Sequence, residues 1–175
     1  MTTERFGMIK FAGKEQTVIG DDIQVGQKAP EFTIQKNDWS LAKGLKETRG
    51  KVRILAAVPS LDTPVCDRET RRFNEAAAQL GKDVAILTLS MDLPVAQKRW
   101  CGAAGVTQVQ TFSDVVKADF GKKYGVLMKE VRLLRRAVFV VDKKGMVVYA
   151  AYMPVNGDEP AYEEVLAAAK KALGK

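Results

Sequence analysis

Two mostly apolar runs restrict the fold of this chain more than any other feature. They cover residues 52–58 and 84–89, and each has the length of one strand that is buried on both faces. Between them, apolar residues recur at i, i+3, i+4 and i+7 from Phe73 to Leu80, which predicts a helix with one buried stripe. Gly81 is placed to end that helix. Because parallel strands need such a crossover, the whole segment predicts a right-handed βαβ unit.

The elements expected outside this unit complete an α/β pattern. Alternating apolar residues around a turn at Gly13 and Lys14 predict an N-terminal β-hairpin over about residues 8–19. The other expected elements are, in order, a short strand (32–34), a helical turn (39–45), a short helix (94–100), a short strand (109–112), a helix (115–124), a buried strand (136–141), an antiparallel return strand (146–152) and a last helix from about residue 160. This order is typical of the thioredoxin-like fold, a mixed central β-sheet flanked by helices, here with an added N-terminal β-hairpin. We expect a single domain over residues 1–175.

Cys66 lies where the first buried strand gives way to the helix. Thr63 and Pro64 suit a helix start, as a hydroxyl N-cap followed by a proline at the first helical position. A thiol in the first turn lies near the positive end of the helix dipole and near free backbone N–H groups, which favour the nucleophilic thiolate. Because Cys66 comes seven residues before Phe73, we expect its sulfur to face the interior.

Composition limits the chemistry that is open to this residue. The chain has 175 residues, with Cys66 and Cys101 as its two cysteines and no histidine. The absence of histidine excludes every Cys–His or Ser–His nucleophile, so an activated cysteine must depend on a helix dipole and a cation. The cysteines are not spaced as Cys-x-x-Cys, and we expect no metal or other cofactor because the thiol itself does the chemistry.

Charge and hydropathy indicate the expected compartment and partners. No apolar segment resembles a secretory signal or a membrane span, so we expect a cytoplasmic protein with no membrane contact. The formal net charge is +7, but the basic residues are spread along the chain. This distribution favours a solvated surface, and nucleic-acid binding is the least favoured function.

Three residues carry the candidate chemistry, and each has an ordinary structural explanation when taken alone. A cysteine such as Cys66 is often simply buried and inert. Arg136 opens an apolar strand and needs an anionic partner, which a thiolate or a carboxylate would supply. Strand alternation places Arg135 and Arg136 on opposite faces, so only one of them reaches Cys66. Cys101, expected at the end of its helix before a cap at Gly102, is otherwise a half-buried thiol.

In combination, these residues resemble the active-site signature of the peroxiredoxin family. The string Pro59-x-x-x-Thr63-x-x-Cys66 carries the resemblance, and Cys101 and Arg136 stand in matching contexts. Further matching blocks run from the N-terminal hairpin to the last helix. The resemblance is closest to the bacterial thiol peroxidases, the atypical two-cysteine group.

The resemblance implies a thiol-dependent peroxidase that reduces hydrogen peroxide and organic hydroperoxides. Cys66 would be the peroxidatic cysteine and become a sulfenic acid, which Cys101 would resolve as an intramolecular disulfide that thioredoxin reduces. Thr63 and Arg136 would hold the peroxide and the developing oxyanion, while Pro59 would shield the sulfur. The resemblance also implies a homodimer. The alternative is a peroxide sensor or redox relay that passes oxidation to a protein partner.

The position of the second cysteine predicts a conformational change. Cys66 follows the end of its strand, and Cys101 lies about seven residues along the next helix, or ~10 Å at 1.5 Å per residue. A disulfide needs Cα atoms within about 7 Å, so the reduced fold is expected to keep the sulfurs apart until a helix unwinds locally. Glu69, one turn after Cys66, is expected either to orient the arginine or to be solvated.

Overall fold

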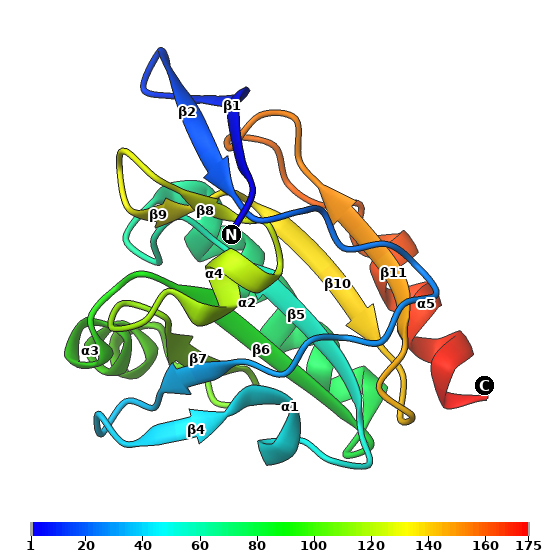
Figure 1. Ribbon diagram of the computed structural model, residues 1–175. Coiled ribbons are helices and arrows are strands. Elements are labelled where there is room, and N and C mark those ends of the chain that lie inside the picture. Colours follow the sequence, from blue (N-terminus) through cyan, green and yellow to red (C-terminus); the bar gives the residue numbers. More distant parts are fainter. Residues whose placement is uncertain (1, 175) are drawn as a thin grey trace.

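The structure of the protein, a computed structural model, describes residues 2–174 and contains two β-sheets (Figure 1). The larger sheet has seven strands in the order β11-β10-β5-β6-β7-β3-β4, and the smaller has four in the order β1-β2-β8-β9. The strands are β1 (Glu4–Phe11), β2 (Lys14–Ile19), β3 (Thr33–Gln35), β4 (Leu41–Lys43), β5 (Val52–Ala57), β6 (Val84–Ser90), β7 (Gln110–Ser113), β8 (Leu127–Met128), β9 (Leu133–Leu134), β10 (Ala137–Val141) and β11 (Val147–Tyr152). The helices are α1 (Gly44–Glu47), α2 (Pro64–Leu80), α3 (Pro94–Ala104), α4 (Asp119–Lys123) and α5 (Tyr162–Leu173).

The predicted βαβ unit forms the centre of the larger sheet. β5 pairs in parallel with β6, with Ile54 opposite Ile86, and α2 connects the two strands. On its other side β5 pairs antiparallel with β10, with Val140 opposite Ile54, so the sheet is mixed. Every residue of β5 is buried, as expected for a strand that is covered on both faces. The predicted fold class is confirmed.

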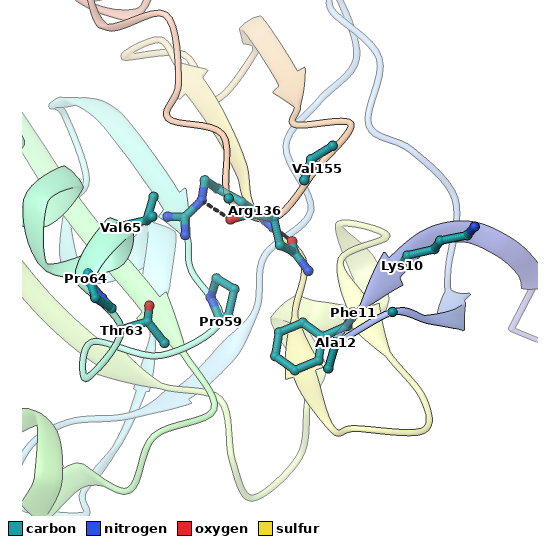
Figure 2. A pocket seen from close by; sticks show the side chains of 12 residues that line it. Lys10, Phe11, Ala12, Pro59, Thr63, Pro64, Val65, Arg136 and Val155 are labelled. Carbon is teal, nitrogen blue, oxygen red and sulfur yellow. Dashed lines mark hydrogen bonds between the residues drawn. The ribbon is translucent and has the colours of Figure 1, made fainter.

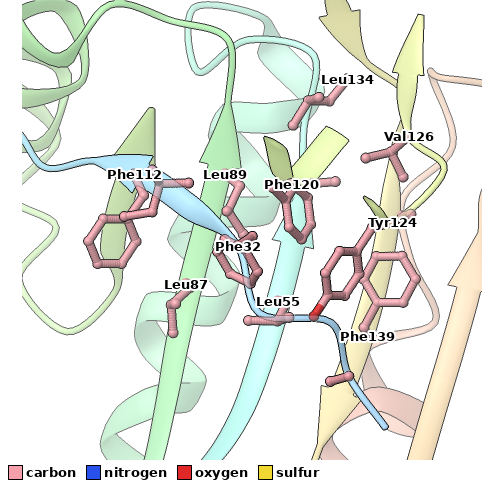
Figure 3. Close-up of a cluster of buried hydrophobic side chains, with 14 of the residues drawn as sticks. Phe32, Leu55, Leu87, Leu89, Phe112, Phe120, Tyr124, Val126, Leu134 and Phe139 are labelled. Carbon is pink, nitrogen blue, oxygen red and sulfur yellow. The ribbon is translucent and has the colours of Figure 1, made fainter. Parts of the chain in front are cut away.

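Two apolar cores lie on opposite faces of this sheet. On one face, α2 and α5 pack against β5, β6 and β10, and Phe73 of α2 and Val165 of α5 are fully buried. On the other face, α4 and its neighbours enclose an aromatic cluster (Figure 3). Phe120 stacks on Tyr124 at 4.5 Å between ring centroids, and Tyr124 packs edge-on against Phe139 at 5.2 Å. These cores fix the strands β5 and β10, from whose ends the candidate site residues project.

The predicted N-terminal hairpin is present and is longer than expected. It runs from Glu4 to Ile19, and its turn lies at Ala12 and Gly13, one residue earlier than predicted, with φ values of 48° and 77°. β2 also pairs with β8, so the hairpin belongs to the smaller sheet. The sequence does not predict β8 and β9, because strands of two residues leave no periodic pattern.

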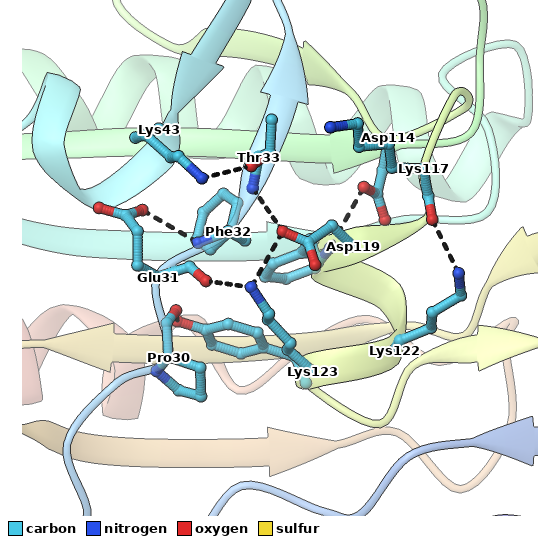
Figure 4. A network of polar contacts seen from close by, with 12 residues as sticks. Pro30, Glu31, Phe32, Thr33, Lys43, Asp114, Lys117, Asp119, Lys122 and Lys123 are labelled. Atoms are coloured by element: carbon cyan, nitrogen blue, oxygen red, sulfur yellow. Dashed lines mark hydrogen bonds and ion pairs between the residues drawn. The ribbon is translucent and has the colours of Figure 1, made fainter. Parts of the chain in front are cut away.

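A polar network connects β3, which lies between β7 and the edge strand β4, to α4 (Figure 4). The Asp119 carboxylate accepts a hydrogen bond from the backbone N–H of Thr33 at 2.7 Å. Lys123 donates both to this carboxylate and to the carbonyl oxygen of Glu31. These bonds hold β3 against α4, in its place between β7 and β4.

Two local expectations are wrong. Residues 39–45, expected as a helical turn, contain β4, which pairs antiparallel with β3 and leads into α1. The helix expected over residues 115–124 is reduced to α4, because Ala118 has a left-handed backbone (φ 49°) that interrupts it. In the first segment, pairing with β3 overrides the local sequence preference.

Candidate active site

Cys66 lies in the first turn of α2, as predicted, and is fully buried. Thr63 is the N-cap residue and Pro64 the first helical residue. Contrary to expectation, the Thr63 hydroxyl caps no backbone N–H; it lies 2.7 Å from Cys66 Sγ and 2.9 Å from the carbonyl oxygen of Ser60. A hydroxyl has one proton, so Thr63 donates either to the sulfur or to Ser60.

Arg136, the residue before β10, reaches the same sulfur. Its Nη2 lies 3.1 Å from Cys66 Sγ, and its Nε donates to the carbonyl oxygen of Asn156 at 3.0 Å. Burial acts to lower the pKa of Arg136, but the nearby Glu69 and Cys66 outweigh burial and raise it. The guanidinium therefore remains a cation beside the sulfur, where it stabilises negative charge.

Arg135 points to the opposite side of the strand. It donates to the carboxylate of Asp22 and to the carbonyl oxygen of Gly125, and its guanidinium lies 4.2 Å from the ring centroid of Tyr152. The expectation that strand alternation allows only one of the two arginines to reach Cys66 is confirmed.

Glu69 is fully buried and forms an ion pair with Arg136 Nη1. Its other carboxylate oxygen has no hydrogen-bond partner among residues 2–174. Burial raises the pKa of Glu69 to about 7, although Arg136 opposes the shift. The alternative that Glu69 is solvated is therefore wrong, and its carboxylate holds the guanidinium that contacts Cys66.

A cavity of about 450 Å³ opens above this group (Figure 2). Pro59, Thr63 and Arg136 line its base, and the tip of the β1–β2 hairpin, with Phe11, forms the opposite wall. Val155, from the loop after β11, closes a third side. Three of the predicted site residues, Pro59, Thr63 and Arg136, therefore line this cavity. The fourth, Cys66, is fully buried and does not line it, but its sulfur contacts both Thr63 and Arg136.

Cys101 lies elsewhere, in the third turn of α3. Its Sγ lies 3.4 Å from the Thr111 hydroxyl on β7, and the residue lines a separate surface cavity of about 430 Å³. α3 continues beyond the expected cap at Gly102 and ends at Gly105, whose φ of 64° is left-handed. Both cysteines are free thiols.

Sequence reasoning missed the site residues that come from loops. Asn156 holds Arg136 through two contacts, since its carbonyl oxygen accepts from Nε and its side-chain Oδ1 accepts from the backbone N–H at 3.0 Å. Phe11 and Val155 could not be found by sequence reasoning, because only the tertiary fold brings them to the cavity that Thr63 and Arg136 also line. An Asn-Gly pair after an edge strand indicates a turn, and that is the only local signal for Asn156.

The fold and the site together define a thiol-based peroxidase. A buried cysteine at a helix N-terminus, bonded to a hydroxyl and a guanidinium at the base of an apolar cavity, fits nucleophilic attack on a small neutral molecule. The sequence model of the family described as Redoxin matches residues 24–166, and the chain belongs to that family.

Comparison with known proteins narrows the class. The chain is 49% identical over 162 residues to the thiol peroxidase of Bacillus subtilis, covering 93% of this chain and 96% of the relative. It is 47% identical over 164 residues to the thiol peroxidase of Listeria innocua, covering 94% and 98%. A crystal structure of a peroxiredoxin-like protein from Aquifex aeolicus superposes with a TM-score of 0.84 at 35% identity, covering 95% of this chain and 98% of that one.

These relatives confirm the predicted family, the peroxiredoxins, and the predicted class of enzyme, a thiol-dependent peroxidase. They do not favour the alternative of a peroxide sensor.

Proposed function

We propose that this enzyme reduces hydrogen peroxide and organic hydroperoxides with Cys66 as nucleophile, Cys101 as resolving thiol and thioredoxin as reductant. The observation that carries the proposal is the convergence of two hydrogen-bond donors on one buried sulfur, Thr63 at 2.7 Å and Arg136 at 3.1 Å. Such donors stabilise a thiolate and, during the reaction, the charge that moves onto the peroxide.

In the first step the Cys66 thiolate attacks one oxygen of the hydroperoxide. The S–O bond forms as the O–O bond breaks, the sulfur is oxidised to a sulfenic acid, and the other oxygen leaves as hydroxide or alkoxide. The leaving oxygen takes up one proton to become water or an alcohol. Arg136 remains charged throughout, because Glu69 and Asn156 hold it in place.

The second step joins the two cysteines. The Cys101 thiol attacks the sulfenic acid, a disulfide forms, and the oxygen leaves as water. Thioredoxin, a dithiol, then reduces this disulfide by thiol–disulfide exchange and is itself oxidised to a disulfide. No cofactor is required for either step.

The sheet order supports the expectation that the second step needs a conformational change. Cys101 rests on Thr111 of β7, whereas Cys66 follows β5, and β6 lies between these strands. Two strand spacings amount to about 10 Å, well beyond the reach of a disulfide. We therefore expect the first turn of α2 or the short helix α3 to unwind before the bond closes.

The partners and the compartment follow from the same chemistry. A disulfide that must be reduced in each cycle needs a dithiol pool, so we place the enzyme in the cytoplasm. Among residues 2–174, no helix is both long enough and apolar enough to cross a membrane. We also expect a homodimer, which sedimentation of the reduced protein would test.

The test is NADPH-coupled turnover of cumene hydroperoxide and hydrogen peroxide with thioredoxin and thioredoxin reductase. Wild type should cycle with both peroxides, Cys66→Ser should be inactive, and Cys101→Ser should complete about one turnover and stop. Sustained thioredoxin-dependent turnover by Cys101→Ser would show that Cys101 is not the resolving thiol. Oxidation of wild type once, with no recycling by any dithiol, would instead indicate a sensor.

A further inference from the structure

A chain of hydrogen bonds joins the loop before Cys66 to the helix that carries Cys101. Its centre is the carboxylate of Asp92, in the segment between β6 and α3. Ser60 donates its hydroxyl to one oxygen of this carboxylate at 2.7 Å, and the backbone N–H of Leu61 donates to the other at 2.9 Å. Asp92 thus fixes the loop whose Ser60 carbonyl oxygen lies 2.9 Å from the Thr63 hydroxyl, the group that also contacts the Cys66 sulfur.

The same carboxylate is connected to α3. The Ser90 hydroxyl donates to Asp92 at 2.7 Å and accepts a hydrogen bond at 3.0 Å from the side-chain amide of Gln97. Gln97 also donates to the carbonyl oxygen of Phe112 on β7 at 2.9 Å. Cys101 lies one turn beyond Gln97 on the same face of α3, so the network anchors the helix next to its cysteine.

The direction of each bond makes a carboxylate necessary at this position. Three donors face it, the hydroxyls of Ser60 and Ser90 and the N–H of Leu61. A carboxylate accepts all three, whereas an amide of the same shape has one acceptor oxygen and would turn an N–H₂ group toward at least one donor. Hydrogen bonds to a charged acceptor are also the stronger class.

The side chain of Gln97, which anchors α3, is buried but only partly satisfied in its hydrogen bonds. Gln97 is fully buried, yet its side-chain oxygen has no partner among the described residues. In α3 only Pro94 and Gln97 are buried, and its apolar packing on the core comes from the partly buried Trp100 and Ala104, so the Gln97 contact is its fully buried polar tie to the sheet. Water would satisfy the unpaired oxygen when α3 detaches, which lowers the barrier to opening.

We propose that Asp92 is a positioning residue, which ties the Cys66 loop to the Cys101 helix and so sets the rate of disulfide formation. The inference rests on the proposed role of Cys101. While the ties hold, Cys66 keeps its contacts and reacts with peroxide; when they break, the helix is released and the two sulfurs meet. Slow release leaves the sulfenic acid exposed to a second peroxide, which oxidises it to sulfinic acid as its own O–O bond breaks to give water or an alcohol.

The sharpest test is Asp92→Asn, with Asp62→Asn as the matched control. Asp62 is an exposed residue two positions after Ser60, and only its backbone N–H contacts the network, by donating to the Ser60 hydroxyl at 3.2 Å. Its substitution by asparagine keeps that N–H and makes the same charge change nearby. After one equivalent of cumene hydroperoxide, acid quenching and mass spectrometry give the rate of disulfide formation and the fraction of sulfinic acid. Asp92→Asn should form the disulfide about tenfold faster and give several-fold less sulfinic acid in excess peroxide, whereas Asp62→Asn should match wild type.

Ser90→Ala provides a second, independent variant, because it breaks the chain on the α3 side and leaves Ser60 bonded to Asp92. If the network acts as a unit, the double variant Asp92→Asn/Ser90→Ala should be no faster than the faster single variant. Rates that multiply would overturn the proposal, as would an unchanged rate in Asp92→Asn. Peptide mapping that finds no Cys66–Cys101 disulfide in wild type would overturn the proposed function and this role together.

Discussion

Replacing Arg136 with methionine tests the electrostatic coupling at the centre of the site. Methionine has a similar length but no charge, so the variant leaves Glu69 buried without its cationic partner. Both side chains are nearly inaccessible, at 1% exposure for Arg136 and 0% for Glu69. Solvent therefore screens the Arg136–Glu69 ion pair only weakly. Removing one partner of such a pair costs about 3–5 kcal/mol of stability when the other partner is charged.

The pH dependence of this loss has a definite sign. Burial raises the pKa of Glu69 to about 7 in the folded protein, above its ordinary value of 4.5. The protonated carboxyl is thus favoured by folding, and its contribution to stability is present below pH 4.5 and is lost as pH rises through the folded pKa. Wild type stops losing stability once Glu69 ionises, near pH 7, because Arg136 then pairs with the carboxylate.

In Arg136→Met the pKa of Glu69 rises further, so the loss of stability continues above pH 7. From pH 7 to 8.5, at 1.36 kcal/mol per pH unit, the variant should lose about 2 kcal/mol more than wild type. Urea unfolding of the reduced proteins at pH 5 and pH 8.5 measures this difference. The value of kcat/KM should also fall about 10²- to 10³-fold, as expected for loss of a charge-stabilising donor.

Two controls separate electrostatics from packing. Arg136→Met/Glu69→Gln removes the titrating group, so its loss of stability should be the same at both pH values. Arg135→Met removes a neighbouring buried arginine whose partner, Asp22, is 31% exposed, and should show no comparable pH dependence. If the destabilisation of Arg136→Met were equal at pH 5 and pH 8.5, the argument that Arg136 compensates a buried carboxylate would be refuted.

Three further substitutions test other parts of the structure. Thr63→Val removes the hydroxyl 2.7 Å from Cys66 Sγ and should slow oxidation by peroxide about 10- to 100-fold in stopped-flow measurements, while Thr63→Ser retains the rate. Phe11→Ala should reduce kcat/KM for cumene hydroperoxide about tenfold and leave that for hydrogen peroxide unchanged; an equal effect on both would exclude Phe11 as a substrate contact. Gly20→Ala places a Cβ 1.9 Å from the carbonyl oxygen of Lys122 at a φ of +89°, so thermal unfolding should show a loss of roughly 2–3 kcal/mol, and an unchanged Tm would contradict this clash.

The parts of the fold that the sequence predicts well are those whose signal is local and strong. The buried strands β5, β6 and β10 are mostly apolar runs, and α2 has both a proline at its start and Gly81 at its end. Strand alternation predicts that only one of Arg135 and Arg136 reaches Cys66, the family resemblance selects Arg136, and the side-chain contacts agree with both. In these places, local pattern and tertiary packing favour the same structure.

The parts that escape prediction depend on contacts between distant segments. The capping role expected for the Thr63 hydroxyl gives way to bonds with Cys66 and Ser60, because a thiol sulfur lies within reach only once the loop is folded. β4 forms where a helical turn is expected, since β3 offers it a strand to pair with. Asp92 follows a strand as an ordinary turn residue does, and nothing in its local sequence reveals the three donors that its carboxylate accepts.

The β1–β2 hairpin divides the active site between two separately supported structures. The reacting groups are held by the larger sheet and α2, whereas the outer wall of the cavity is the tip of a hairpin that pairs only within the smaller sheet. Substitutions at that tip can alter which peroxides fit without disturbing the bonds to the sulfur. Selection for a new substrate, in nature or in the laboratory, can therefore act on a few residues around Phe11 while the chemistry at Cys66 stays unchanged.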